Sequence, residues 1–462
     1  MSLMMDKSIE HRVGELVAKQ RVYFLSHQTR DIEFRLRSLR ALRSSIVAHE
    51  AELVEALYTD IGKSYEEAYL TEISIVLTEI DNFLKHLRGW AAPSKKRSPL
   101  KLLPSSSEIL TEPLGVALII APWNYPMQLL LNPLVGAIGA GCTAVLKPSP
   151  YTPNVAKVLE RIISDSFDES YIAVVQGNRD VNTALLRERY DIIFFTGSPE
   201  LGRVVMRAAA ENLTPVVLEL GGKSPVVVDK SANIKLSAKR VAWGKTLNAG
   251  QTCIAPDYLL IHPDVKENFI AAYAEAIKEL HGMDVKHSRH YARIVSDRAF
   301  ERVSSYLADG RVRVGGAMDA AQRYIEPTLL DEVSVDSPIM QTEIFGPILP
   351  MIDIESVDEA VEFINSREKP LALYVFADKA TARYVFDHTS SGGGCINDTI
   401  MHVVSENLPF GGVGNSGMGR YHGRDSLYAF SHRRSVVTTP KSFDLPVRYM
   451  PYRWFRYIKR ML

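Results

Sequence analysis

The chain has 462 residues, of which 46% are apolar, and its 54 basic residues balance its 54 acidic residues to a net charge of zero. A chain of this length and apolar content is expected to form two or three domains with substantial cores. The charge balance excludes a global field that would favour nucleic acid or an acidic partner. Three widely spaced cysteines, Cys142, Cys253 and Cys395, fit neither a disulfide framework nor a zinc site. We therefore expect a protein of a reducing compartment, with the cytoplasm as the default location.

The N-terminal third is predicted to be helical. Its first fifteen residues carry charges where a signal peptide needs an apolar stretch, so we expect no secretion. From Tyr69 to Leu87, apolar residues recur in steps of three and four, which predicts one face of an amphipathic helix. The stretch 31–57 has a similar pattern. The longest apolar region, 129–146, is interrupted by polar residues, proline and glycine, so we interpret it as a buried helix followed by a strand and not as a membrane span.

A linker rich in Pro, Ser and Lys, residues 93–107, separates these helices from an alternating region. Short apolar runs there are separated mostly by helical patterns, which is typical of parallel strands with crossover helices. The runs lie at 116–120, 143–146, 172–175, 192–195 and 216–218. A second set, near 226–228, 258–261, 344–351 and 373–376, predicts another α/β domain.

Two residues are candidates for nucleophilic chemistry. Cys253 follows a small, polar run in TLNAGQTCIAPD, which lets the backbone approach a substrate closely. The thiolate is the reactive form, and an ordinary cysteine is mostly protonated at neutral pH, so it needs a base. Glu219, in VLELGGKSP, ends an apolar run before two glycines and can take a proton from the thiol or from a water. Taken singly, each residue has an ordinary alternative: Cys253 can be an inert buried cysteine, and Glu219 can be a carboxylate on the surface.

A glycine-containing turn follows one predicted strand. Thr196, Gly197 and Ser198 come directly after the run 192–195, and Gly202 lies five positions after Gly197. Backbone amides at the start of the next helix can hold a pyrophosphate, and ligands of doubly wound sheets bind at such strand ends. As a bare pattern the turn is ordinary, so nucleotide binding and simple packing both stay open.

Seven segments resemble the aldehyde dehydrogenase superfamily in the family's own order, over about residues 21–432. They are APWNYP (121–126), AVLKPS (144–149), FFTGSPELG (194–202), LELGGKSP (218–225), GQTCIAPD (250–257), EIFGP (343–347) and LPFGGVGNSGMGRYHG (408–423). The chain is most similar to the class 3 branch, whose members typically form dimers and oxidise aromatic or medium- to long-chain aldehydes.

The resemblance implies an α/β fold with a Rossmann-type cofactor domain, an α/β catalytic domain and a small oligomerisation β-arm. We expect the dinucleotide-binding domain at 1–105 and 115–218 and the catalytic domain at 219–396. The arm is expected at 106–114 and 397–440. A basic and aromatic tail occupies 441–462.

The resemblance also implies a covalent mechanism. Cys253 adds to the aldehyde to give a thiohemiacetal, hydride passes to NAD or NADP, and water activated by Glu219 hydrolyses the thioester. The amide of Asn124 and the backbone N–H of Cys253 are expected to hold the charge that develops on oxygen. In isolation, Asn124 between two prolines also suits a turn.

Four further residues match cofactor contacts of the family. Ser198 resembles the phosphate contact, Lys147 the adenosine ribose contact, Glu343 the nicotinamide ribose clamp, and Phe345 the residue packed near the nicotinamide. A solvated lysine, a loop carboxylate and a core aromatic are their ordinary alternatives. Where NAD-preferring relatives carry a glutamate three residues after the lysine, this chain has Pro150. The absence of this glutamate removes a repulsion against a 2′-phosphate, so we expect NADP to be accepted, and a preference for NADP over NAD stays open.

Substrate and partners are less defined. Trp123, Tyr125, Met127 and His402 can line an apolar channel for an aromatic or longer aliphatic aldehyde, or serve in core packing and turns. The tail can lie on an anionic membrane surface, pack across a homodimer or cover the substrate entrance; we expect no membrane contact. Outside this enzyme class, a cysteine-dependent esterase without cofactor and a noncatalytic protein on the same fold remain open.

Overall fold

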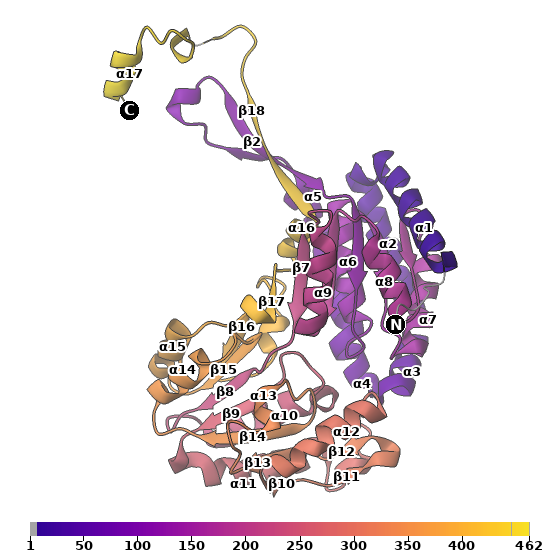
Figure 1. Cartoon of the computed structure of the whole chain (residues 1–462), viewed down its shortest axis with the longest axis vertical. Helices are drawn as coiled ribbons and strands as arrows, with labels where there is room; N and C mark the ends of the chain where they lie inside the picture. Colours follow the sequence, from indigo (N-terminus) through magenta and orange to yellow (C-terminus); the bar gives the residue numbers. More distant parts are fainter. Residues whose placement is uncertain (1–6, 445, 462) are drawn as a thin grey trace.

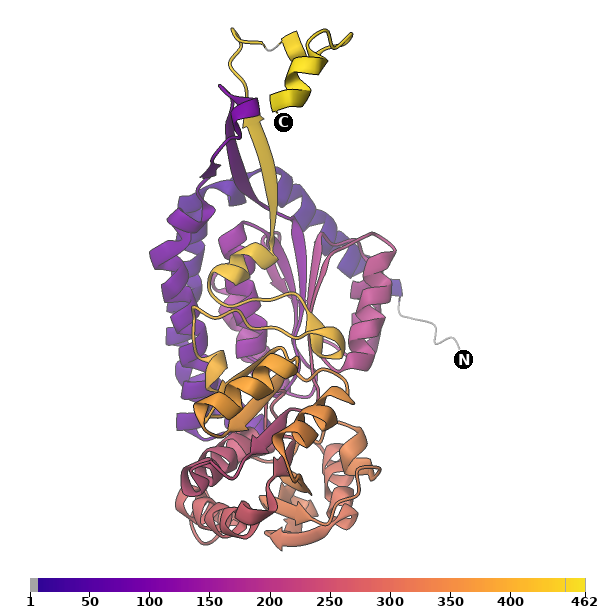
Figure 2. The same ribbon diagram turned by 90° about the vertical axis from the view of Figure 1, so that its left-hand side faces the viewer.

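The computed structural model describes residues 7–444 and 446–461. Two α/β domains lie one above the other, and a β-arm extends from the upper domain (Figure 1). A view turned by 90° shows the arm standing clear of both domains, with the C-terminal segment beyond its tip (Figure 2). The predicted α/β architecture with a projecting arm is confirmed.

The sheet of the upper domain contains β3 (Val116–Ile120), β4 (Thr143–Lys147), β5 (Ile172–Val174), β6 (Ile192–Gly197), β7 (Val216–Leu220) and β17 (Gly417–Met418). Their order is β17-β7-β6-β3-β4-β5; β3 to β7 pair in parallel and β17 is antiparallel to β7. Along β3, alternate residues belong to two separate core layers, one on each face. Because both faces are covered, these strands appear in the sequence as continuous apolar runs.

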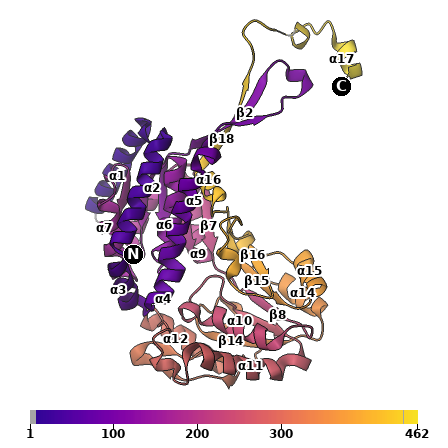
Figure 3. The same ribbon diagram turned by 180° about the vertical axis from the view of Figure 1, so that it is seen from behind.

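Helices cover both faces of this sheet, as the view from behind also shows (Figure 3). One layer contains α1 (Lys7–Leu25), α8 (Arg179–Arg187) and α9 (Pro199–Ala210). The other contains α2 (Ile32–Ala48), α3 (Glu50–Ile61), α5 (Ser74–Ala91), α6 (Gln128–Ala140) and α7 (Pro153–Ser164). The apolar region 129–146 is therefore a buried helix followed by a strand, as predicted. Among the described residues, no helix is both long and apolar enough to cross a membrane.

The predicted amphipathic helix is present but interrupted. It begins as α4 (Tyr65–Ala68), passes through a π-helical turn η2 (Tyr69–Ile73) and continues as α5. The predicted apolar stripe from Ile73 to Leu87 is buried. The stretch 31–57 is two helices, α2 and α3, which meet at His49.

The lower domain contains β8 (Pro225–Val228), β9 (Tyr258–Ile261), β10 (Arg311–Val314), β13 (Thr328–Asp331), β14 (Ile348–Asp353), β15 (Ala372–Phe376) and β16 (Gly393–Ile396). They form one sheet in the order β10-β13-β14-β9-β8-β15-β16, which is parallel except for β10. A short hairpin joins β11 (Met318–Asp319) to β12 (Tyr324–Ile325). The helices of this part are α10 (Ile234–Thr246), α11 (Pro263–His281), α12 (Asp297–Ser305), α13 (Pro338–Gln341), α14 (Val357–Asn365) and α15 (Lys379–His388).

The predicted strand at 344–351 was placed too early. The strand β14 begins at Ile348, and the residues before it form a loop. Phe345 has a φ of 49°, in the left-handed region, and Pro347 has no N–H to donate to a ladder. This correction matters because it puts Glu343 and Phe345 on a loop that faces the upper domain.

The arm is a three-stranded antiparallel sheet of β1 (Ser94–Lys96), β2 (Ser106–Pro113) and β18 (Ser431–Thr438). Its strand β1 lies in the predicted linker. Residues 397–430, which we had expected in the arm, lie elsewhere: β17 pairs with β7, and α16 (Arg424–Ala429) packs on α6. The described part of the chain ends in the short helix α17 (Phe455–Met461), past the arm.

Candidate active site

Several segments that were singled out in the sequence meet between the two domains. From its carboxyl end, β7 leads directly into β8 of the lower domain (Figure 1). Because β3, β4 and β6 run parallel to β7, their carboxyl ends lie at the same edge of the sheet. Glu219 lies near the end of β7, where it pairs in register with Thr196 of β6 and Gly417 of β17. Opposite them are the loop that carries Cys253, after α10, and the loop before β14 that carries Glu343. The strand-end position expected for a doubly wound sheet is therefore observed.

Cys253 follows a tight turn, η4 (Leu247–Gly250), in which Asn248 and Ala249 both have a φ of 51°. The residue is partly exposed. Burial of the sulfur, with the nearby carboxylates of Glu343 and Glu219, raises the pKa of the Cys253 thiol. The thiol is therefore neutral, and a base would have to remove its proton before the sulfur could act as a nucleophile.

Glu219 is only 3% exposed, and neither of its carboxylate oxygens has a hydrogen-bond partner within the described chain. Burial raises the pKa of Glu219 well above its ordinary value, with the charge of Arg420 opposing the shift. An unpaired buried acid destabilises a fold, so its presence here points to chemistry rather than to packing. The raised pKa makes Glu219 a stronger base once it is ionised, whereas the raised pKa of Cys253 makes the thiol proton harder to remove.

Asn124 lies in the turn between β3 and α6 and is 2% exposed. Its Nδ2 donates to the main-chain oxygen of Gln251, 3.0 Å away, and this contact fixes which way the amide faces. The second N–H of the same nitrogen remains available, and Oδ1 has no partner among the described residues. The amide is thus held by the cysteine loop with one donor to spare.

The turn after β6 has the features of a phosphate site. The buried hydroxyl of Thr196 finds no hydrogen-bond partner in residues 7–444 and 446–461. Ser198 caps α9, and its hydroxyl accepts from the N–H of Leu201 at 3.4 Å. Anions bind favourably at such helix starts because of the free N–H groups and the helix dipole.

Two glycines allow close packing here, Gly197 at the end of β6 and Gly202 in the first turns of α9. A Cβ at Gly197 would lie 2.5 Å from the ring of Phe195, and one at Gly202 would lie 2.7 Å from Leu220. Gly202 therefore lets α9 pack closely on β7, which brings the helix start over the strand ends.

Lys147 ends β4 and is 1% exposed. Its Nζ donates to the main-chain oxygen of Pro148 at 2.7 Å, and burial lowers the pKa of Lys147 to about 8. No carboxylate pairs with it in the described part of the chain. Pro150 is exposed in the turn that follows. A buried ammonium with spare donors suits a ribose hydroxyl or a phosphate oxygen.

Glu343 lies on Gly221, since a Cβ at that glycine would be 1.9 Å from Glu343 Oε2. Burial, then the charge of Asp257, raises the pKa of Glu343 to about 8. The ring of Phe345 meets Trp123 edge to face, with centroids 5.4 Å apart. The two residues expected near the nicotinamide therefore lie at the domain interface.

The loop that carries Glu343 is fixed by residues that the sequence interpretation missed. Asp257 accepts from the N–H of Ile344 at 2.9 Å, and Lys223 pairs with Asp257 while donating to the main-chain oxygen of Thr342 at 3.0 Å. Arg302 donates to the main-chain oxygens of Glu343 and Ile344 at 3.2 and 2.9 Å. Lys223 and Asp257 stand inside quoted motifs, but nothing in the sequence pairs them, and Arg302 has no local signal at all.

The four residues considered for a substrate channel differ in their burial. Trp123 is half-exposed, whereas Met127 is fully buried and Tyr125 is 7% exposed, with its hydroxyl 2.6 Å from Thr252 Oγ1. For Tyr125 and Met127 this favours the core-packing alternative. His402 is half-buried, and burial lowers its pKa to about 4, so the ring is neutral. Its Nδ1 lies 3.5 Å from Cys395 Sγ.

A dinucleotide fits the donor set described above. An unpaired Thr196 hydroxyl, the start of α9 and the buried Lys147 ammonium lie at strand ends of the upper sheet. From the lower domain, the Glu343 carboxylate reaches Gly221, two residues after Glu219. When bound, NAD or NADP supplies a hydride acceptor.

Comparisons with known proteins identify the family of the chain. The profile of the aldehyde dehydrogenase family matches residues 5–436. The chain is 48% identical to 4,4'-diaponeurosporen-aldehyde dehydrogenase of Staphylococcus aureus, covering 95% of this chain and 96% of that protein. It is 45% identical to the dimeric NADP-preferring aldehyde dehydrogenase of Canis lupus familiaris, covering 95% and 98%. The substrate-bound structure of Staphylococcus aureus AldH superposes with a TM-score of 0.95 at 47% identity, over 97% and 98% of the two chains. The chain thus belongs to the aldehyde dehydrogenase family and is an NAD(P)-dependent aldehyde dehydrogenase of the class 3 type.

Proposed function

We propose that Cys253 is the nucleophile, Glu219 the general base and Asn124 an oxyanion donor in the oxidation of an apolar aldehyde. The observation that carries this assignment is the unpaired, buried Glu219 beside a thiol whose pKa is raised. The esterase and noncatalytic alternatives have no comparable observation in their favour. Without a cofactor, they leave the buried ammonium of Lys147 and the fixed loop of Glu343 unexplained.

The chemistry proceeds through the chain's own residues. The thiol of Cys253 transfers its proton to Glu219 as sulfur attacks the aldehyde carbon, and the resulting oxyanion accepts from Asn124 Nδ2 and the Cys253 N–H. Loss of hydride from that carbon leaves a thioester on Cys253. Glu219 first releases the thiol proton to solvent and then accepts a proton from water, whose oxygen attacks the thioester. The carboxylic acid departs as that second proton passes from Glu219 to the sulfur of Cys253.

For cofactor binding we propose that Thr196, Ser198 and the start of α9 hold the pyrophosphate. Lys147 is assigned to the adenosine ribose or its 2′-phosphate, Glu343 to the nicotinamide ribose. The exposed Pro150 offers no carboxylate to repel a 2′-phosphate. This supports use of NADP as well as NAD.

The substrate is proposed to be an aromatic or medium- to long-chain aliphatic aldehyde. Trp123 and Phe345 offer aromatic surface at the domain interface, and His402 is uncharged. We also propose a homodimer, since relatives at 44% to 45% identity are named dimeric and the arm projects from the body. The domain limits expected from the sequence remain a proposal, except that we assign the arm to the strands β1, β2 and β18. The strand β1 thereby moves from the expected dinucleotide-binding domain to the arm.

Reduced-cofactor formation tests this function. Benzaldehyde, hexanal and dodecanal are each supplied with NAD and with NADP to native protein and to Cys253→Ala. We expect turnover by native protein with both cofactors and its loss in the variant. Cys395→Ala, which removes the other partly exposed thiol, is the matched control and should keep its activity. Turnover that survives in Cys253→Ala would overturn the assignment.

A further inference from the structure

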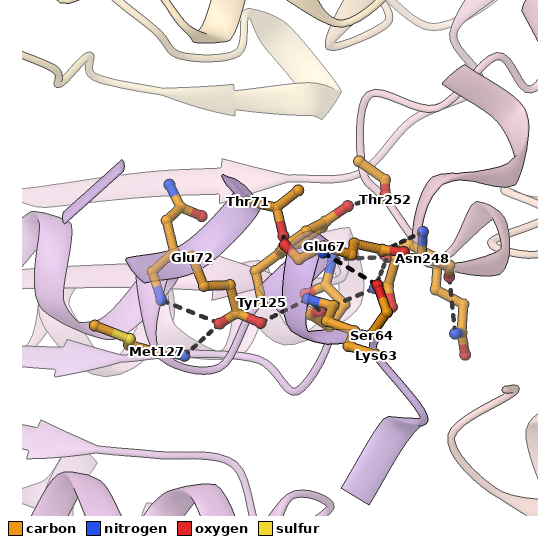
Figure 4. Close-up of polar contacts among 12 residues, drawn as sticks. Lys63, Ser64, Glu67, Thr71, Glu72, Tyr125, Met127, Asn248 and Thr252 are labelled. Carbon is orange, nitrogen blue, oxygen red and sulfur yellow. Dashed lines mark hydrogen bonds and ion pairs between the residues drawn. The ribbon is translucent and has the colours of Figure 1, made fainter. Parts of the chain in front are cut away.

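A fully buried ion pair lies behind the active-site turn. Lys63 Nζ and Glu72 Oε1 are 2.6 Å apart, and both side chains have 0% exposure. Lys63 lies between α3 and α4, and Glu72 lies in the π-helical turn η2, so both belong to the N-terminal helices (Figure 4). Removing two charges from water is costly, and an apolar pair of similar size would often be as stable. Stability of the core is therefore a weak reason for this pair.

The remaining hydrogen-bonding capacity of the pair goes to the turn between β3 and α6. Lys63 Nζ donates to the main-chain oxygen of Asn124 at 3.0 Å and lies 3.9 Å from the centre of the Tyr125 ring. Glu72 Oε2 accepts from the N–H groups of Met127 at 2.9 Å and Gln128 at 3.3 Å. The pair thus holds the turn at two places: at Asn124, the residue assigned as oxyanion donor, and at the start of α6.

The opposite side of the turn is held by the cysteine loop. Asn248 Nδ2 donates to the same main-chain oxygen of Asn124 at 2.9 Å and to that of Gln251 at 3.2 Å. Tyr125 meets Thr252 through their hydroxyls. The main-chain oxygen of Asn124 therefore has two donors, an ammonium from the N-terminal helices and an amide from the loop of Cys253.

We propose that Lys63 and Glu72 are positioning residues, which hold the main chain of Asn124 so that its side-chain amide faces the oxygen of an aldehyde attached to Cys253. The inference rests on the role proposed above for Asn124. The π-helical turn supports it, because such turns occur mostly as single-turn bulges within α-helices and are frequent at functional sites. A shift of about 1 Å in a positioned group can cost about 100-fold in rate.

The variants separate positioning from stability. Lys63→Met leaves the Glu72 carboxylate buried and uncompensated, and Glu72→Gln keeps the shape without the charge. The double variant Lys63→Met/Glu72→Met removes both charges, and we expect it to recover thermal stability lost in Lys63→Met. Lys266→Met is the matched control: its ammonium lies 2.6 Å from Asp331 Oδ1, with 14% and 7% exposure, and joins α11 to β13 away from the turn.

Each variant is assayed for kcat and KM, for the rate at which iodoacetamide alkylates Cys253, and for Tm. For Lys63→Met and for the double variant we expect kcat to fall about 10- to 100-fold, with cofactor KM and alkylation rate nearly unchanged. We expect Lys266→Met to have a lower Tm than the native protein and an unchanged kcat. A double variant with native Tm and reduced kcat would identify positioning rather than stability.

The decisive measurement repeats Lys63→Met on an Asn124→Ala background. If Lys63 acts through Asn124, its effect on kcat should shrink there to about threefold or less, because the two losses share one cause. Equal losses in both backgrounds would overturn the inference. A native kcat in the double variant would also overturn the inference. If the lysine variants do not fold, a native kcat in Glu72→Gln would overturn it instead. If Asn124→Ala itself keeps native activity, the role proposed for Asn124 fails instead, and this inference with it.

Discussion

Replacing Glu219 by Gln is expected to separate the two halves of the reaction. The amide keeps the shape of the side chain but cannot accept a proton. General-base catalysis contributes about 100- to 10,000-fold, so steady-state turnover should fall within that range. Attack by Cys253 also uses this base, but sulfur is intrinsically a far better nucleophile than water, so we expect hydrolysis of the thioester to slow more than formation of the thiohemiacetal. Hydride transfer itself does not require the base.

The structure also predicts the effect of this variant on stability. Burial raises the pKa of Glu219, so the folded state holds its proton at pH values where the unfolded chain has lost it. The native protein therefore loses stability as pH rises from the unfolded pKa, about 4.3, towards the folded pKa, by up to about 1.4 kcal/mol per pH unit. Gln does not titrate, so Glu219→Gln should be the more stable protein at high pH, and the gap should narrow as pH falls towards 5.

Two assays follow from this reasoning. Rapid mixing with hexanal and NADP should show a burst of reduced cofactor in Glu219→Gln, followed by slow turnover as the thioester accumulates. Thermal unfolding from pH 5 to pH 8.5 should show a Tm difference from native protein that grows with pH. A native steady-state rate would refute the hydrolytic role, and a pH-independent Tm difference would refute the account of burial.

Other consequences can be tested separately. Pro150→Glu should raise the ratio of NAD to NADP efficiency about tenfold or more, because a carboxylate there repels a 2′-phosphate; an unchanged ratio in steady-state kinetics would remove this explanation. Gly221→Ala should displace Glu343, since its Cβ would lie 1.9 Å from Oε2, and should raise the KM for cofactor by about tenfold; a native KM would show that Glu343 does not act from this position. Light scattering after gel filtration should give the mass of a dimer, and a monomer would contradict the proposed assembly. Neither the full chain nor a chain ending at Pro446 should sediment with anionic vesicles; sedimentation of the full chain alone would assign membrane contact to the tail.

The sequence located the strands of the upper sheet because each strand and the polar residues near its end are neighbours along the chain. The strands β3, β4, β6 and β7 are buried on both faces, so each appears as an apolar run, and polar residues near their carboxyl ends belong to the candidate site. Glu219 and Thr196 were found in this way. The strand before Ile348 was misplaced because apolar Ile344 and Phe345 belong to a loop with a left-handed residue, which composition does not reveal.

The residues that the sequence could not supply act across long chain distances. Lys63 and Glu72 look like ordinary charges on helices, and only folding shows that they are buried against a turn some sixty residues later. Lys223 and Asp257 support the Glu343 loop from two separate motifs. For Tyr125 and Met127 the sequence left channel lining and core packing open, because a single sequence does not distinguish an aromatic wall from a core contact.

The central claim is that the aldehyde becomes a thioester on Cys253. Glu219→Gln should be incubated with hexanal and NADP, quenched in acid, and examined by intact mass and peptide mapping. We expect one hexanoyl group per chain, carried by the peptide that contains Cys253. The absence of an acyl group while reduced cofactor forms, or an acyl group on Cys142 or Cys395, would contradict the account.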